Sequence, residues 1–237
     1  MKLNLEIFNE KHPLFSIKNY TILENKINLI FGESGIGKSL ANQTVFGCLP
    51  NNDLSIKIND QNYATYKKTP EFQKLIKRSA YVWQEPANFL YPYDTVESQL
   101  DDGLLKKIES EPVLKRLWQD SSYLNLLDVF PKDQNPSGGE KQRILLAMAL
   151  KKALLVDDPF IVFDEPTGNL DEAHRNLFLK LIWDIFSQKD CTFVLITHDY
   201  GILQWFAKNL LLGQFQNIAV AEWIKQKNEV SHCILNA

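Results

Sequence analysis

Long apolar runs are missing from this sequence of 237 residues, and cysteine is scarce. No stretch of about 18 apolar residues occurs, so the sequence predicts no segment that spans a membrane by itself. Residues 1–6 alternate apolar and polar types like a strand and lack the apolar core of a signal peptide. The three cysteines, Cys48, Cys191 and Cys233, have no metal-type spacing, and reduced thiols in the cytoplasm are expected.

An excess of positive charge is also absent. The chain has 26 basic and 29 acidic residues, a net charge of -3, so nothing indicates a nucleic-acid partner, which would require a basic surface. Hydrophobic residues make up 45% of the sequence, enough for a sizeable core. This length fits one domain or one domain with an inserted lobe.

Strand-like and helix-like patterns alternate along most of the chain. Strands are predicted at residues 3–8, 15–23, 27–31, 79–83, 160–163 and 192–197, and helices at residues 38–49, 137–155 and 171–187. Between residues 86 and 136 the chain is rich in leucine, with apolar positions at helical spacing, which indicates a helical lobe inserted into an α/β core. The alternation predicts a largely parallel sheet covered on both faces.

Residues 32–39, with the sequence GESGIGKS, fit the phosphate-loop pattern G-x-x-x-x-G-K-[ST] between a predicted strand and a predicted helix. The glycines allow successive backbone N–H groups to point toward one anion, and the helix adds its positive end. Lys38 is expected to reach the β- and γ-phosphates, and the Ser39 hydroxyl to bind Mg²⁺. The structural alternative is a glycine-rich turn that contains Lys-Ser by chance.

Two acids, Asp164 and Glu165, end the apolar strand predicted at residues 160–163. Because ligands of open α/β sheets bind beyond the carboxyl ends of strands, both acids are expected to face the phosphate loop. Asp164 is predicted to hold Mg²⁺, and Glu165 to orient and polarise the attacking water as a general base. Two acids merely solvated at the edge of a strand are the alternative.

Residues 136–143, with the sequence PSGGEKQR, resemble the signature motif of the ABC ATPases. Ser137 is expected to cap the following helix and Glu140 to close a capping box. The N–H groups of Gly138 and Gly139 then form a second anion site at a helix N-terminus. The resemblance implies that this second site serves the nucleotide of a partner, so the chain is expected to pair with a second copy or with another ABC ATPase subunit.

Two residues of this motif depart from the family pattern. Pro136 stands where leucine is usual, and Glu140 where glutamine is usual. Proline has no backbone N–H to donate, and the glutamate adds negative charge near a phosphate site, although a helix N-terminus favours an acid. Both changes are expected to weaken the site formed with the partner without removing its donors.

Three further segments resemble ABC motifs in the family's order. Gln84 resembles the glutamine that joins core and lobe and contacts Mg²⁺ and water. Residues 168–171 resemble the D-loop along the dimer interface, and His198 resembles the switch histidine that contacts the γ-phosphate. A structural histidine at a strand end is the alternative for His198.

The resemblance covers almost the entire chain and implies the P-loop NTPase (RecA-like) fold. It implies a single domain of residues 1–237, with a core at about 1–85 and 137–237. An antiparallel β-subdomain is expected at the N-terminus of the core, and the α-helical lobe at about 86–136.

The sequence thus predicts an ATPase that uses ATP and Mg²⁺. Its catalytic residues are predicted to be Glu165, His198, Gln84 and Lys38. Its nucleotide-binding residues are predicted to be Gly32, Glu33, Ser34, Gly35, Ile36, Gly37, Lys38, Ser39, Leu40, Ser137, Gly138 and Gly139. Its Mg²⁺ ligands are predicted to be Ser39, Gln84 and Asp164. Phe8 is the first candidate for stacking on adenine and Tyr20 and Phe15 are the others, with a core role as the alternative for each.

Short segments bear on the subfamily. Residues 84–86, 90–92 and 95–100 resemble the peptide and nickel importers, whereas residues 165–171 have the form common in lipoprotein-release and macrolide-export ATPases. Import is favoured, with the chain at the cytoplasmic face of the inner membrane. Its expected partners are transmembrane permease subunits, which contact a groove at residues 87–95, and a solute-binding protein in the full system.

Two other classes of protein stay open. A soluble ABC ATPase of DNA repair or translation would carry a long insertion or a second such domain, neither of which is present, so a small cofactor-assembly factor is what is left of that class. A non-hydrolysing regulatory subunit is opposed by the intact Lys38, Glu165 and His198.

Overall fold

The fold is described from a computed structural model. It describes residues 2–9, 12–48, 54–85, 93, 95, 98, 116–119, 136–226 and 229–236. The predicted helical lobe at 86–136 lies almost entirely outside these residues and stays a prediction. No helix within the described ranges is long and apolar enough to cross a membrane.

One mixed sheet organises the described chain, with ten strands in the order β5-β4-β1-β2-β10-β9-β3-β8-β7-β6. The strands are β1 (Lys2–Asn9), β2 (His12–Thr21), β3 (Ile27–Gly32), β4 (Leu54–Ile58), β5 (Gln61–Asn62), β6 (Ser79–Val82), β7 (Phe160–Asp164), β8 (Thr192–Ile196), β9 (Ile218–Gln226) and β10 (Glu229–Asn236). From β9 to β6 neighbouring strands are parallel, whereas β5, β4, β1 and β2 pair antiparallel. The α/β fold with a largely parallel core is therefore confirmed.

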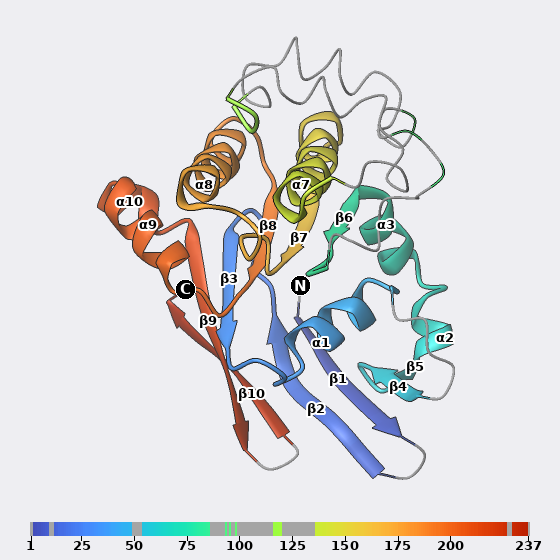
Figure 1. Cartoon of the computed structure of the whole chain (residues 1–237). Helices are drawn as coiled ribbons and strands as arrows, with labels where there is room; N and C mark the ends of the chain where they lie inside the picture. The colour runs from blue at the N-terminus through green and yellow to red at the C-terminus, as the bar shows by residue number, and fades with distance from the viewer. Residues whose placement is uncertain are drawn as a thin grey trace.

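Helices cover the parallel strands on both faces. They are α1 (Lys38–Val45), α2 (Tyr63–Tyr66), α3 (Pro70–Arg78), α7 (Gly138–Leu155), α8 (Glu172–Phe186), α9 (Gly201–Asn209) and α10 (Leu212–Phe215). Alternate residues of β3 face opposite ways, as strand geometry requires: Leu29 packs in the core with α7 and α8, and Ile30 in the core with α1. Figure 1 shows α7 and α8 together, well apart from α1.

The first helix is shorter than predicted. It ends at Val45 instead of residue 49, because Gly47 adopts a left-handed conformation (φ 72°). The N–H of Gly47 donates to the carbonyl of Thr44 at 3.1 Å, and that of Cys48 to the carbonyl of Gln43 at 2.8 Å. This pair of hydrogen bonds is the Schellman arrangement that closes a helix. A Cβ on Gly47 would lie 2.6 Å from the Phe72 ring, so packing also requires glycine there.

No element was predicted after residue 197, yet β9 and β10 lie in the middle of the sheet. They form an antiparallel hairpin in which β9 runs parallel to β3 and β10 runs parallel to β2. Trp223 of β9 pairs with Gly32 at the end of β3, and its side chain is 2% exposed. The end of the chain therefore joins the antiparallel strands to the parallel ones.

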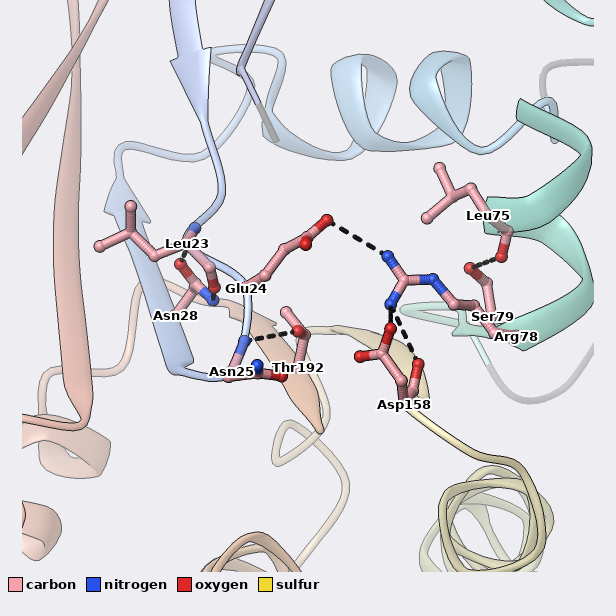
Figure 2. A network of polar contacts seen from close by, with 9 residues as sticks. All are labelled: Leu23, Glu24, Asn25, Asn28, Leu75, Arg78, Ser79, Asp158 and Thr192. Atoms are coloured by element: carbon pink, nitrogen blue, oxygen red, sulfur yellow. Dashed lines mark hydrogen bonds and ion pairs between the residues drawn. The ribbon is translucent and has the colours of Figure 1, made fainter. Parts of the chain in front are cut away.

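The edge of the sheet where the parallel strands begin, called here the amino edge, is closed by a polar network (Figure 2). Arg78, at the end of α3, donates through Nη1 to both the carbonyl oxygen and the carboxylate of Asp158. Its Nη2 donates to Glu24 at 3.2 Å. Nearby, the N–H of Asn25 donates to Thr192 Oγ1 at 3.0 Å. One guanidinium thereby ties together the segments that precede β3, β6 and β7.

Candidate functional site

The opposite edge, where the parallel strands end, gathers most of the predicted site and is called here the carboxyl edge. β3 ends at Gly32 and β7 at Asp164, and both strands pair with β8. In the register of the sheet, Ile196 of β8 lies opposite Ile30 on one side and Asp164 on the other. The phosphate loop, the two acids and the segment that carries His198 thus leave the sheet at one level.

Glycine backbones shape the phosphate loop between β3 and α1. Gly35 has φ 77° and Gly37 has φ 104°, both in the region that glycine adopts without a steric cost. Gly37 directly precedes α1, so the N–H groups of the first helical turn point into the loop. A Cβ on Gly32 would lie 3.0 Å from the carbonyl oxygen of Trp223, so β9 approaches the loop closely.

Lys38 is buried in the loop, with 5% of the residue exposed. Its Nζ donates to the carbonyl oxygens of Gly32 at 2.7 Å and Glu33 at 2.9 Å. Burial lowers the pKa of Lys38, while the carboxylates of Glu165 and Asp164 oppose that shift. A cation is thus held inside the loop where backbone donors and a helix N-terminus already favour an anion.

Asp164 lies beside this cation and is 1% exposed. Its Oδ1 accepts a hydrogen bond from Ser39 Oγ at 2.9 Å, and its Oδ2 accepts one from the Tyr81 hydroxyl at 2.8 Å. Burial raises the pKa of Asp164, and the two hydroxyl donors oppose the shift. Tyr81 was missed by sequence reasoning, because no local pattern places it next to the acid.

These oxygens fit Mg²⁺. The Ser39 hydroxyl and the Asp164 carboxylate meet within 2.9 Å at the end of the phosphate loop, and both are the hard oxygen ligands that this ion prefers. Among the described residues, no three His, Cys, Asp or Glu side chains gather as in an all-protein metal cage. A single carboxylate with one hydroxyl suits an ion that takes its other ligands from phosphates and water.

Glu165 has a left-handed backbone (φ 48°), which costs a non-glycine residue roughly 1–3 kcal/mol. Its N–H donates to the carbonyl of Ile196 at 2.9 Å. Its Oε2 accepts from Thr197 Oγ1 at 3.1 Å, and its Oε1 lies 2.8 Å from Nδ1 of His198. Glu165 and His198, which were each predicted to be catalytic, are therefore in direct contact. Thr197 is a second hydrogen-bond partner of Glu165, and sequence reasoning missed it.

His198 itself is open to solvent, with 67% of its side chain exposed. When Nδ1 donates to Glu165, Nε2 is the ring nitrogen left to meet a ligand. Gln84 is also exposed and follows the end of β6, the strand next to β7. Both residues therefore lie beyond strand ends on the carboxyl edge.

The second predicted anion site lies at the N-terminus of α7. The N–H of Ser137 donates to Glu140 Oε2 at 2.7 Å, and the N–H of Glu140 donates to Ser137 Oγ at 3.3 Å. The predicted capping box is thus present, and Glu140 supplies half of it. Gly138 and Gly139 pack against Asn169, and a Cβ on Gly139 would lie 3.0 Å from its carbonyl oxygen. The two glycines let the segment at residues 168–171 approach the start of α7.

A chain of polar contacts continues from this junction. Asp171 caps α8 by accepting from the N–H of His174 at 2.9 Å, and its other carboxylate oxygen lies 2.7 Å from Nδ1 of that ring. Nε2 of the ring lies 2.6 Å from Arg143 Nη1 on α7. Because a guanidinium only donates, Nε2 accepts and Nδ1 carries the proton. The helices α7 and α8 are thereby held together.

One candidate for the aromatic that stacks on adenine is wrong. Tyr20 is fully buried, its ring packs edge-on against Trp223 and His232, and its hydroxyl donates to Asn42 at 2.6 Å. Its core role leaves no ring face for a ligand. The side chains of Phe8 and Phe15 lie outside what the structure describes, so both stay candidates.

Comparison with known proteins gives one family. The family model of the ABC transporter matches residues 16–168. The chain is 30% identical over 198 residues to the dipeptide transport ATP-binding protein DppD of Bacillus subtilis, covering 78% of this chain and 57% of that protein. It is 29% identical over 222 residues to the thiamine import ATP-binding protein ThiQ of Haemophilus influenzae, covering 93% and 94%. The chain thus spans little more than half of the first relative.

Solved structures show the same fold. The ATP-binding cassette MJ0796, in a dimeric post-hydrolysis state bound to ADP and Pi, superposes with a TM-score of 0.64. The match covers 98% of this chain and 99% of that one at 20% identity, a level at which the likeness shows the fold alone.

Proposed function

Because the chain belongs to the ABC transporter family, we propose that it binds and hydrolyses ATP to energise transport across a membrane. The observation that carries the proposal is the convergence of a buried lysine, a hydroxyl and two acids at one edge of the sheet. That combination matches the parts that phosphoryl transfer requires, namely anion binding, a metal site and a group that orients water.

Nucleotide binding is proposed for the phosphate loop and the start of α1. The N–H groups of residues 33–40 and the Lys38 ammonium would bind the phosphates, since both favour negative charge at one place. Ser39, Asp164 and Gln84 would hold Mg²⁺, which offsets phosphate charge when bound. Tyr81 and Ser39 support this role of Asp164 by fixing both of its oxygens.

Hydrolysis is proposed to depend on Glu165. Its side chain is 13% exposed and directly follows β7 at the carboxyl edge, where the carboxylate can accept a hydrogen bond and then a proton from water. Thr197 and His198 fix its two oxygens, so the direction of the carboxylate is set before a substrate arrives. Preorganisation of this kind favours the charge distribution of a transition state.

Dimerisation is proposed because the described residues contain, apart from the phosphate loop, a second helix N-terminus of the predicted anion-binding type, at the start of α7. The start of α7, with Ser137, Gly138 and Gly139, would contact the nucleotide of a facing ABC ATPase subunit, either a second copy or a relative. Asn169 packs on these glycines, which supports a shared role of this junction at the interface.

For the direction of transport and the solute, we propose import of a peptide or of a nickel compound. Similarity to the dipeptide transport protein supports it, whereas similarity to the thiamine import protein widens the range of imported solutes. The partners would be transmembrane permeases and a solute-binding protein, with this chain at the cytoplasmic face of the membrane. The groove proposed at residues 87–95 lies mostly outside the described residues, but Tyr93 is 61% exposed, as a contact residue should be.

The test is Glu165→Gln, which keeps the size of the side chain and removes the base. ATP hydrolysis should fall by at least about 100-fold, while ATP binding is kept and a dimer accumulates in size-exclusion chromatography with ATP. Glu71→Gln, on the exposed first turn of α3, is the matched control and should hydrolyse ATP normally. Wild-type turnover in Glu165→Gln would refute the assignment of the base.

A further inference from the structure

The Tyr81 hydroxyl is a hydrogen-bond donor that the family resemblance did not predict. It lies 2.8 Å from Oδ2 of Asp164, and since an ionised carboxylate only accepts, the phenol is the donor. Tyr81 belongs neither to the phosphate loop nor to the strand that ends in the two acids. It therefore supports Asp164 from a third element, β6.

Strand register explains how the hydroxyl reaches the acid. Tyr81 of β6 pairs with Val162 of β7, and the side chains of Val162 and Asp164 lie on the same face because they are two residues apart. The ring is held between other aromatics, with its centroid 5.0 Å from that of Trp83 and 6.2 Å from that of Phe46. The hydroxyl thus has a fixed place at the carboxyl edge.

The two oxygens of Asp164 have different partners. Oδ1 accepts from Ser39, whose hydroxyl is itself proposed to bind Mg²⁺, whereas Oδ2 accepts from Tyr81. Asp164 as a residue is 1% exposed, so solvent does not replace a missing donor freely. By holding Oδ2, the phenol directs Oδ1 toward the phosphate loop and sets the rotation of the carboxylate.

We infer that Tyr81 is a positioning residue for Mg²⁺ binding, through its hydrogen bond to Asp164; this inference rests on the proposed function. Partners that orient a metal-binding carboxylate typically change metal affinity by about 10- to 100-fold when removed. Because the Tyr81 ring keeps its packing in Tyr81→Phe, that variant removes the donor alone.

The experiment titrates Mg²⁺ against the full-length chain with a fluorescent ATP analogue, and repeats the binding in EDTA. Tyr81→Phe should need on the order of ten times more Mg²⁺ for half of the Mg²⁺-dependent binding, with unchanged affinity in EDTA. Tyr66→Phe is the matched control, because the buried Tyr66 donates to a backbone carbonyl, that of Val45, at 3.2 Å. It should leave the Mg²⁺ midpoint unchanged.

A double substitution tests whether the effect passes through Asp164. In an Asp164→Ala background, where no side-chain acceptor is left for the phenol, Tyr81→Phe should add no further shift of the Mg²⁺ midpoint. An unshifted midpoint in Tyr81→Phe, an equal loss of binding in EDTA, or failure of that variant to fold would each overturn the inference. Wild-type binding that does not respond to Mg²⁺ would overturn the proposed metal site as well, which separates the two failures.

Discussion

Two lysines, one at each edge of the parallel strands, make the same kind of contact and differ in what surrounds them. Lys38 donates to the carbonyls of Gly32 and Glu33 at the carboxyl edge, and Lys152 donates to the carbonyl of Ser79 at the amino edge. Burial lowers the pKa of both. However, Lys38 begins a helix and Lys152 lies in the last turn of one.

The polarity of the helices explains why these two positions differ in function. A cation near a helix C-terminus is stabilised by the carbonyl groups there, so Lys152 completes a local balance of charge. A cation at a helix N-terminus joins groups of its own sign, so Lys38 adds to a site that favours an anion. The type of residue therefore says less about function than its position relative to the ends of helices and strands.

The largest effect is expected from Lys38→Met. ATP binding and turnover should fall by at least about 100-fold, because the charge-assisted contact to the phosphates is lost. The unfolding free energy should not fall, because the substitution removes a positive charge from a helix N-terminus, where positive charge is unfavourable. Nucleotide binding, phosphate release and urea unfolding measure the three quantities.

Lys152→Met is the matched variant at the amino edge and should keep turnover within about two-fold while losing roughly 1–2 kcal/mol of stability. Should it lose turnover as strongly as Lys38→Met, the two edges would not differ in the way described.

The second effect concerns stability at the amino edge. Arg78→Met removes the donor to Asp158 and Glu24 and should lower the unfolding free energy by about 2 kcal/mol, the scale of hydrogen bonds to charged groups. Turnover of the folded protein should stay at the wild-type level, because the network lies away from the phosphate loop. Urea unfolding and a steady-state ATPase assay give both values, and a large loss of turnover at full stability would contradict the separation.

Sequence reasoning predicted the carboxyl edge well where the signal is local. The phosphate loop and its acids follow from strand ends and glycine spacing, and the capping box of Ser137 and Glu140 follows from positions three residues apart. Loops of this kind carry their conformation in adjacent residues, so no distant contact is needed to recognise them.

What was missed depends on contacts between distant residues. Tyr81 and Asp164 are 83 positions apart, so their hydrogen bond has no local pattern. Tyr20 looked available for adenine because a strand does not reveal which neighbours cover it, and here β9 and β10 do. The end of α1 was predicted four residues beyond its actual end at Val45, because the need for glycine at position 47 comes from the distant Phe72 ring.

The third prediction asks how the carboxyl edge depends on the hairpin of β9 and β10. Trp223 packs under the phosphate loop, and its Nε1 donates to Nδ1 of His232 at 2.8 Å. Burial lowers the pKa of His232 to about 4, with the backbone of Thr21 opposing part of the shift. The unfolded chain takes up this proton near its ordinary pKa of about 6.5.

The sign follows from these two values. Above about pH 6.5 both states are neutral and the stability is complete, and as the pH falls toward 4 the unfolded state alone gains a proton. Between pH 7.5 and 5 the wild type should therefore lose about 2 kcal/mol more than His232→Asn, which keeps an acceptor for Trp223 without titrating. Urea unfolding at both pH values measures this loss of unfolding free energy. If the wild type and His232→Asn lost the same amount between pH 7.5 and 5, His232 would not contribute to the pH dependence.

The smallest effect is expected from an ion pair that is open to solvent. Arg116 lies 2.6 Å from Asp184 of α8, but 42% of the arginine side chain is exposed, so solvent weakens the attraction. Arg116→Met should change the unfolding free energy by about 0.5 kcal/mol and leave ATP turnover unchanged. Urea unfolding beside Arg78→Met gives the comparison directly, because both variants remove a guanidinium paired with acids. A loss as large as that of Arg78→Met would mean that burial at the amino edge does not set the strength of such pairs.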